Sequence, residues 1–139
     1  MRLTVFHNHA PEALWEKSLN KLITPLAYQE LKKMGDVHLA VFNDGVVGIS
    51  VSKNDNIVYL KVRDITRRRG VGKYLIEETC AYIIESGFDA VSFDIKSVPV
   101  NEQDGMIYFL EMQGFIQSPE DPLVFIYRED FDEDDSDND

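Results

Sequence analysis

The sequence has very little cysteine and no long apolar run. Cys80 is its only cysteine, so the chain cannot form an internal disulfide. Cys80 falls within a helical pattern, where we expect a small buried hydrophobic side chain and no redox chemistry. No window approaches the ~18 apolar residues that cross a bilayer, and the start, MRLTVFHNHAPEALW, lacks the features of a signal peptide. We therefore expect a cytoplasmic protein without membrane contact.

Basic residues are also scarce, with 14 Lys and Arg against 25 Asp and Glu, which gives a formal net charge of -11. Such a chain lacks the extended basic face that nucleic-acid backbones require, so we expect no nucleic-acid partner. Residues 129–139 alone hold eight of the carboxylates. We expect this acidic tail to be disordered, either as a solubilising segment or as a docking arm for a basic partner.

The remaining residues, 1–128, suit one domain with a single core. Period-two patterns predict strands, 3.6-residue patterns predict helices, and Gly, Pro and Asn-Asp-Gly mark the breaks. The expected strands are 2–6, 37–43, 46–52, 57–63, 88–95 and 122–128, and the expected helices are 11–22, 25–34, 70–87 and 106–112. This order predicts an α/β fold, a mixed layer in which the helix 70–87 crosses over between two strands.

The stretch VRDITRRRGVGKYL, residues 62–75, lies where a predicted strand meets the long helix. Free backbone N–H groups at a helix start attract anions, and glycine at 70 and 72 lets a ligand approach them. Arg67, Arg68 and Arg69 add guanidinium groups that match phosphate oxygens. The spacing fits neither a P-loop nor a dinucleotide fingerprint, because Tyr74 and Leu75 stand where those motifs require other residues. The local chemistry predicts a phosphate or pyrophosphate ligand.

The pattern Arg67-Arg68-Arg69-Gly70-Val71-Gly72 between a strand and a helix resembles the acyl-CoA pyrophosphate loop of the GNAT N-acetyltransferase superfamily. The order of elements over residues 1–128 and the ending Gln113-Gly114-Phe115 are similar as well. The resemblance implies a GNAT fold, a mixed and mostly antiparallel sheet flanked by helices, in which two central strands diverge. It also implies that acetyl-CoA or CoA binds to the strand residues Leu60, Lys61 and Val62 and to the loop residues Thr66, Arg67, Arg68, Arg69, Gly70, Val71, Gly72 and Lys73.

A catalytic apparatus is harder to find. The tyrosine that serves as acid in many GNAT enzymes corresponds to Leu110, and Tyr108 lies about 200° away around the helix, so it is a weak substitute. Asp94 is a possible base. Other titratable residues have no convincing role, namely the helix carboxylates Glu77 and Glu78 and the histidines His7, His9 and His38. The CoA site is better supported than the transferase.

The run LKVRDITRRRGVGKYLIEE, residues 60–78, closely resembles the PanZ/PanM family, whose members have a GNAT-like fold. The start MRLT and the turn at Phe42-Asn43 are also similar, whereas the acidic tail and residues 10–35 depart from the pattern. The resemblance implies an acetyl-CoA-dependent maturation factor that binds aspartate 1-decarboxylase, PanD, promotes cleavage of its zymogen and inhibits the mature enzyme, with Asn43 facing the partner. The alternative is an active N-acetyltransferase for a small amine or a protein N-terminus.

Overall fold

The computed structural model describes residues 2–63 and 70–129. Residues 64–69, which include Thr66 and the three arginines of the predicted pyrophosphate loop, lie outside the described residues. Most of the predicted acidic tail, from residue 130 onward, lies outside them too. Within the described ranges, no helix is long and apolar enough to span a membrane.

The core of the fold is a seven-stranded sheet in the order β1-β2-β3-β4-β5-β7-β6, in which only β4 and β5 pair in parallel. The prediction of a mixed, mostly antiparallel sheet is therefore confirmed. The strands are β1 (Thr4–His7), β2 (Asp36–Phe42), β3 (Gly45–Lys53), β4 (Asn56–Val62), β5 (Ala90–Asp94), β6 (Ile116–Gln117) and β7 (Val124–Arg128). β6, a two-residue edge strand, is absent from the sequence prediction.

Helices cover both faces of the first four strands. The short helix η1 (Ala13–Trp15) leads into α1 (Glu16–Leu22) and α2 (Pro25–Met34). These helices share a core cluster with Leu39 and Val41 of β2, whereas Ala40 between them packs with α3 (Val71–Glu85). Successive strand residues point to opposite faces of a sheet, so α3 lies on the face away from α1 and α2.

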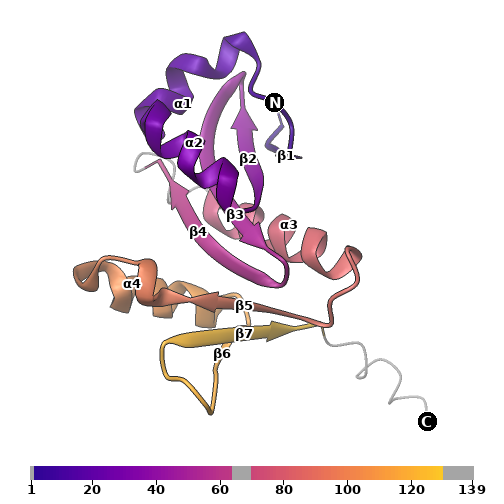
Figure 1. The fold of residues 1–139 in the computed structure, drawn as a ribbon, viewed down its shortest axis with the longest axis vertical. Coiled ribbons are helices and arrows are strands. Elements are labelled where there is room, and N and C mark those ends of the chain that lie inside the picture. The colour runs from indigo at the N-terminus through magenta and orange to yellow at the C-terminus, as the bar shows by residue number, and fades with distance from the viewer. Residues whose placement is uncertain (1, 64–69, 130–139) are drawn as a thin grey trace.

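The second half of the chain contains η3 (Ile95–Ser97) and α4 (Val100–Met112). α4 begins six residues before the predicted Met106, since Pro99 suits a helix start and its carbonyl accepts the first turn's hydrogen bond from the Glu102 N–H at 2.8 Å. Leu110 of α4 is fully buried with Phe93 of β5. These contacts join α4 to the lower half of the sheet in Figure 1.

The two halves of the sheet meet over a very short ladder. β4 and β5 pair only at Asn56 with Ser92 and at Ile57 with Phe93, and beyond these residues the strands diverge. Figure 1 shows β4 rising away from β5 toward the left, with α4 on the side of β5. The divergence that the GNAT resemblance implied is present.

Candidate functional site

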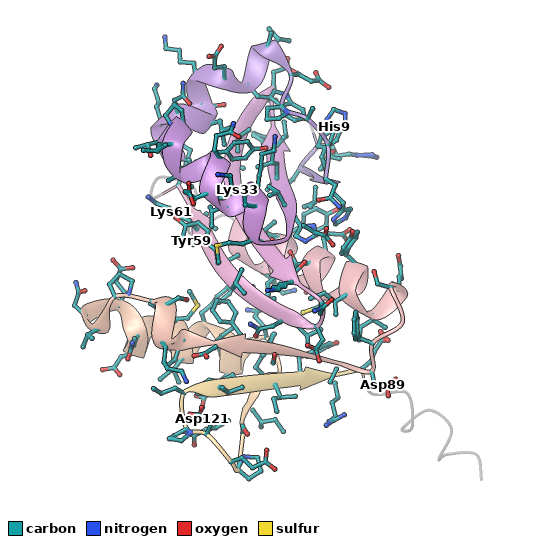
Figure 2. All side chains as sticks on the ribbon, in the orientation of Figure 1. His9, Lys33, Tyr59, Lys61, Asp89 and Asp121 are labelled. Carbon is teal, nitrogen blue, oxygen red and sulfur yellow. The ribbon has the colours of Figure 1, made fainter. Side chains whose placement is uncertain are left out.

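The diverging strands leave a groove of about 860 Å³ between β4, β5 and α4. Its first wall is the end of β4, from Tyr59 to Val62, and Gly72 of α3 adjoins that wall. Its second wall is α4, through Asn101, Glu102, Gly105, Met106 and Phe109. An extended ligand can therefore lie between a strand edge and a helix face. Tyr59 and Lys61 follow one another along β4 on this side of the molecule (Figure 2).

The backbone of β4 offers hydrogen-bonding groups to this groove. The Arg63 N–H donates to the Val47 carbonyl of β3 at 2.9 Å, and the β3–β4 register continues through Lys61 with Ile49. Alternate residues of an antiparallel strand direct their backbone groups to opposite edges, so those of Leu60 and Val62 face away from β3. On that side the ladder with β5 has already ended at Ile57. The backbone groups open to the groove are thus those of Leu60 and Val62, while Lys61 bonds to β3. The predicted binding of CoA by Leu60, Lys61 and Val62 stays a prediction.

The start of α3 lies beside the open edge of β4. Gly70 precedes the helix in the left-handed region, with φ 77°, and no side chain of the described residues caps it. The Tyr74 N–H donates to the Gly70 carbonyl at 3.0 Å, so the N–H groups of the preceding helical residues have no partner inside the helix. Together with the partial positive charge of a helix start, such groups favour an anion, and the predicted pyrophosphate site at this position stays a prediction.

Gly72 provides the space for a ligand at this point. A Cβ atom at position 72 would lie 3.4 Å from Cζ of Phe109 and 3.7 Å from Cγ2 of Val62. The glycine thus lies between Phe109 of α4 and Val62 of β4, and a side chain there would enter the groove. The role of Gly72 in ligand binding stays a prediction.

The other predicted loop residues divide between packing and solvent. Val71 is buried against the sheet, and the exposed Lys73 pairs with Glu77 at 3.1 Å. Neither lines the groove. The exposed Lys61 does line it and supplies a cation near the helix start. The roles of the loop residues in ligand binding stay predictions.

The catalytic candidates lie away from the groove or serve local structure. Tyr108 is 68% exposed and is not among the lining residues, and Leu110 is buried in the core. Asp94 accepts a hydrogen bond from the Lys96 N–H at 2.9 Å and so caps η3. The described residues contain no group of three or more His, Cys, Asp or Glu side chains arranged for a metal ion.

Two of the histidines form a closed network at the other end of α3. Nδ1 of His7 lies 2.8 Å from Nδ1 of His38, whose Nε2 lies 2.9 Å from the Ser52 hydroxyl. Tyr82 stacks on His7 with the ring centroids 4.9 Å apart and donates to Asp36 at 3.0 Å. Burial and then the neighbouring His7 lower the pKa of His38 to about 4, so its imidazole is neutral at pH 7. The network joins β1, β2 and β3 to α3, and His38 at its centre is fully buried.

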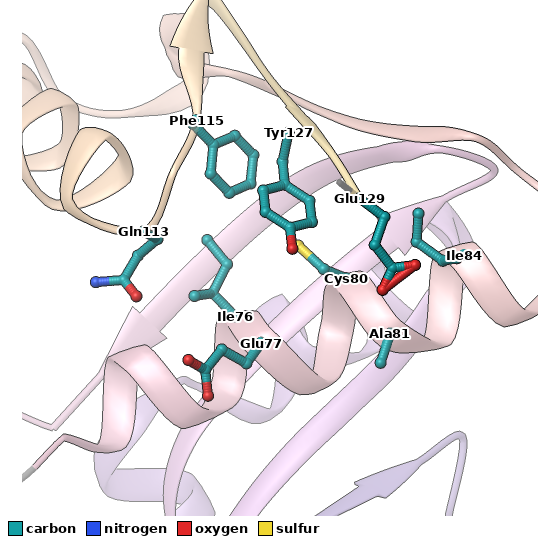
Figure 3. A pocket seen from close by; sticks show the side chains of 9 residues that line it. All are labelled: Ile76, Glu77, Cys80, Ala81, Ile84, Gln113, Phe115, Tyr127 and Glu129. Carbon is teal, nitrogen blue, oxygen red and sulfur yellow. The ribbon is translucent and has the colours of Figure 1, made fainter. Parts of the chain in front are cut away.

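A second pocket lies between α3 and β7. It has a volume of about 150 Å³ and is lined mainly by apolar side chains, including Ile76, Phe115 and Tyr127, around Cys80 (Figure 3). Burial and then Glu77 raise the pKa of the Cys80 thiol to about 12. Since a thiolate is the reactive form of cysteine, this thiol is inert at pH 7. The prediction of a buried Cys80 is confirmed.

The sequence reasoning missed Tyr59 and Glu102, which line the groove from opposite walls. Tyr59 is half-buried, and burial followed by the Glu102 carboxylate raises the pKa of its hydroxyl. Tyr59 belongs to a predicted strand, but Glu102 lies before the predicted start of the α4 helix. A helix begun at Pro99 would have placed Glu102 on the face of Phe109, seven residues later.

The turn between β2 and β3 lies outside the groove. Asn43 and Asp44 are exposed, have φ values of 54° and 62°, and connect the paired residues Phe42 and Gly45. Such values are typical of a two-residue hairpin turn, as the Asn-Asp-Gly sequence predicts. The partner-facing role of Asn43 stays a prediction.

These features define a protein class: the fold is that of the GNAT acetyltransferases. A GNAT family acetyltransferase from Elizabethkingia anophelis with acetyl-CoA bound superposes with a TM-score of 0.66 at 12% identity, covering 91% of this chain and 98% of that one. The putative N-acetyl transferase YhhK from E. coli, bound to coenzyme A, gives a TM-score of 0.71 at 21% identity, with coverage of 93% and 100%.

Within that class, the family model described as "Acetyltransferase (GNAT) domain, PanZ" matches residues 17–120. The chain belongs to the PanZ family. The PanD regulatory factor of Salmonella typhimurium is 35% identical over 83 residues, which make up 57% of this chain. The match spans 62% of that relative's length.

Proposed function

We propose that this protein binds acetyl-CoA, or CoA, in the groove and in that form regulates aspartate 1-decarboxylase, PanD. The observation that carries the proposal is the groove itself, an open strand edge that leads to the uncapped start of α3. An open backbone edge suits the amide groups of the pantetheine arm, and unpaired helix N–H groups suit a diphosphate.

The pyrophosphate assignment extends to Thr66, Arg67, Arg68 and Arg69 by their position in the sequence. They connect Arg63 to Gly70, and both of these flanking residues lie beside the groove's open strand edge and helix start. The guanidinium groups of Arg67, Arg68 and Arg69 would complete an anion site to which the described residues contribute few cations. Lys61 and Lys73 would contribute longer-range charge, although Lys73 already pairs with Glu77.

Two observations support regulation over acetyl transfer. The chain is a member of the PanZ family and resembles a relative named PanD regulatory factor. The position of the usual acidic tyrosine is Leu110, which is 0% exposed, and Tyr108 points to solvent outside the groove. Acetyl-CoA would then act as a structural ligand whose binding orders the surface that PanD recognises. By linkage, PanD would tighten acetyl-CoA binding by the same factor that acetyl-CoA tightens PanD binding.

The test mixes the purified protein with PanD zymogen, with acetyl-CoA, with CoA and without either, and follows chain cleavage by mass spectrometry. We expect cleavage to accelerate when acetyl-CoA is present. A parallel assay offers acetyl-CoA and a panel of amines and measures release of free CoA. No acceleration under any condition would refute the regulatory proposal, and steady CoA release would favour the acetyltransferase.

A further inference from the structure

The two ends of the groove differ in chemistry. One end, here called the phosphate end, is formed by Val62, Gly72 and Phe109, where α3 begins. The other end, here called the closed end, lies toward the point where β4 and β5 pair. It carries four polar side chains, Tyr59, Ser97, Asn101 and Glu102. A ligand anchored at the phosphate end therefore reaches a polar environment at its far end.

The distance between the two ends of the groove is about the same along both walls. Along β4, Tyr59 precedes Val62 by three residues, which is about 10 Å at ~3.3 Å per residue. Along α4, Glu102 precedes Phe109 by seven residues, which is also about 10 Å at ~1.5 Å per residue. Since Phe109 packs beside Gly72, Glu102 lies at the closed end. The arm of CoA between its diphosphate and its sulfur is at least this long, so the acyl group of a bound thioester would reach Tyr59 and Glu102.

Glu102 sets the charge at the closed end. Its carboxylate acts on the Tyr59 hydroxyl across the groove, so its field spans the space between the walls. The start of α4 adds an opposing charge of about half a unit, which a full carboxylate outweighs. Lys61, which also lines the groove from β4, lies two residues closer to the phosphate end than Tyr59, so a bound diphosphate would be its nearer anion.

We propose that Glu102 makes this groove select CoA thioesters with an uncharged acyl group and reject those with an acidic one. A second carboxylate, such as that of a malonyl group, would lie in the same small space as the Glu102 carboxylate. Like charges at a partly exposed site of this kind cost about a tenfold loss of affinity. The proposal rests on the CoA-binding function proposed above and adds a specificity determinant to that site.

The test measures dissociation constants by calorimetry for CoA, acetyl-CoA, butyryl-CoA and malonyl-CoA. Butyryl-CoA controls for size, because its acyl chain is at least as long as that of malonyl-CoA and has no charge. We expect malonyl-CoA to bind about tenfold more weakly than butyryl-CoA, and high salt to narrow the difference because exposed charges are screened.

The decisive variant is Glu102→Gln, which retains the shape of the side chain and removes its charge. Glu102 is exposed, so the fold should tolerate the change. We expect the malonyl-to-butyryl difference to fall to about twofold or less. Glu111→Gln is the matched control, since Glu111 is also exposed on α4 but does not line the groove. It should leave the difference intact.

The outcomes separate this inference from the proposed function. If CoA itself fails to bind, the proposed function fails and takes the inference with it. If CoA and acetyl-CoA bind but malonyl-CoA binds as tightly as butyryl-CoA, the inference alone is overturned. It is also overturned if Glu102→Gln and Glu111→Gln leave the same difference.

Discussion

The two ends of α3 differ in how their polar groups are hydrogen-bonded. At its start, Gly70 offers no capping side chain, the first N–H groups have no partner inside the helix, and Gly72 lines the groove. Near its end, Tyr82 stacks on His7 and bonds to Asp36 and Asn8, at 3.0 and 3.1 Å. No buried side-chain nitrogen or oxygen of the described residues lacks a partner. Helix-start N–H groups without a side-chain partner among the described residues therefore suit a ligand, whereas the bonded side chains near the other end support the fold.

The largest expected effect is a loss of stability in acid, and it concerns the histidine network near the end of α3. Because burial holds the His38 pKa near 4, below about 6.5 in the unfolded chain, the unfolded state takes up the proton first as pH falls. Stability from this group is complete above pH 6.5 and is lost between about pH 6.5 and 4. The loss is on the order of 3 kcal/mol, measured by urea unfolding across this range.

His38→Gln isolates the histidine contribution from that of the many carboxylates. Glutamine can still bond to Ser52 and His7 but does not titrate, so the variant should lose stability less steeply between pH 6.5 and 4. His9→Gln is the matched control, because His9 is exposed. Equal pH slopes for wild type and His38→Gln would contradict a neutral, buried His38.

The second-largest effect is expected at the start of α3, beside the groove. Replacing Arg67 with Ala and Gly70 with Val should weaken acetyl-CoA binding about 100-fold, or ~2.7 kcal/mol, by removing a cation and straining the helix start. Gly87→Val is the matched control, since Gly87 also has a positive φ, 109°, with nothing within 4 Å of its Cβ position. Calorimetry should show a loss only in the first variant. Unchanged binding there would refute the assigned site.

A smaller loss should follow from filling the groove. Gly72→Leu places a side chain against Phe109 and should weaken acetyl-CoA binding about 30-fold, or ~2 kcal/mol, while thermal unfolding shows that the helix persists. Ala81→Leu makes a similar change on the same helix but faces the pocket around Cys80. It should leave acetyl-CoA binding intact. Equal affinities for the two variants would show that the ligand lies elsewhere.

The smallest effect is expected at Tyr108. Because this side chain is exposed and outside the groove, Tyr108→Phe should change PanD cleavage by less than about twofold. The measurement is the rate of zymogen cleavage with acetyl-CoA present. A loss of CoA release from amines in this variant, with binding intact, would instead identify Tyr108 as a catalytic acid.

The sequence predicted the fold more completely than the site. Strong periodicity located β2, β3, β4 and α3 to within a few residues, and the turn at Asn43-Asp44 forms as its residue types indicate. The start of α4 was misplaced, because the polar residues Asn101, Glu102 and Asp104 gave no helical period. The Gln103 side chain holds this first turn by donating to the Ile95 and Val98 carbonyls. β6 is too short to leave a period-two signal.

The parts of the candidate site that backbone groups form could be predicted from the sequence. The parts that depend on side chains far apart in the sequence could not. Gly70 and Gly72 signal a close ligand approach by residue type alone. Tyr59 and Glu102 face each other only because β4 and β5 part after Ile57, which no local pattern encodes. The pairing of His7 with His38 likewise depends on the β1–β2 register, which places these two residues opposite one another.

The open edge of β4 also affects which substitutions this sequence can accept during evolution. Leu60 and Val62 present main-chain groups to the groove, and every residue except proline carries the same N–H and C=O. Their side chains can drift among apolar types without altering what the ligand meets. Selection would act instead on small positions such as Gly72, where any added atom enters the groove. A ligand site formed by backbone groups can thus be retained after most of the surrounding residues have changed.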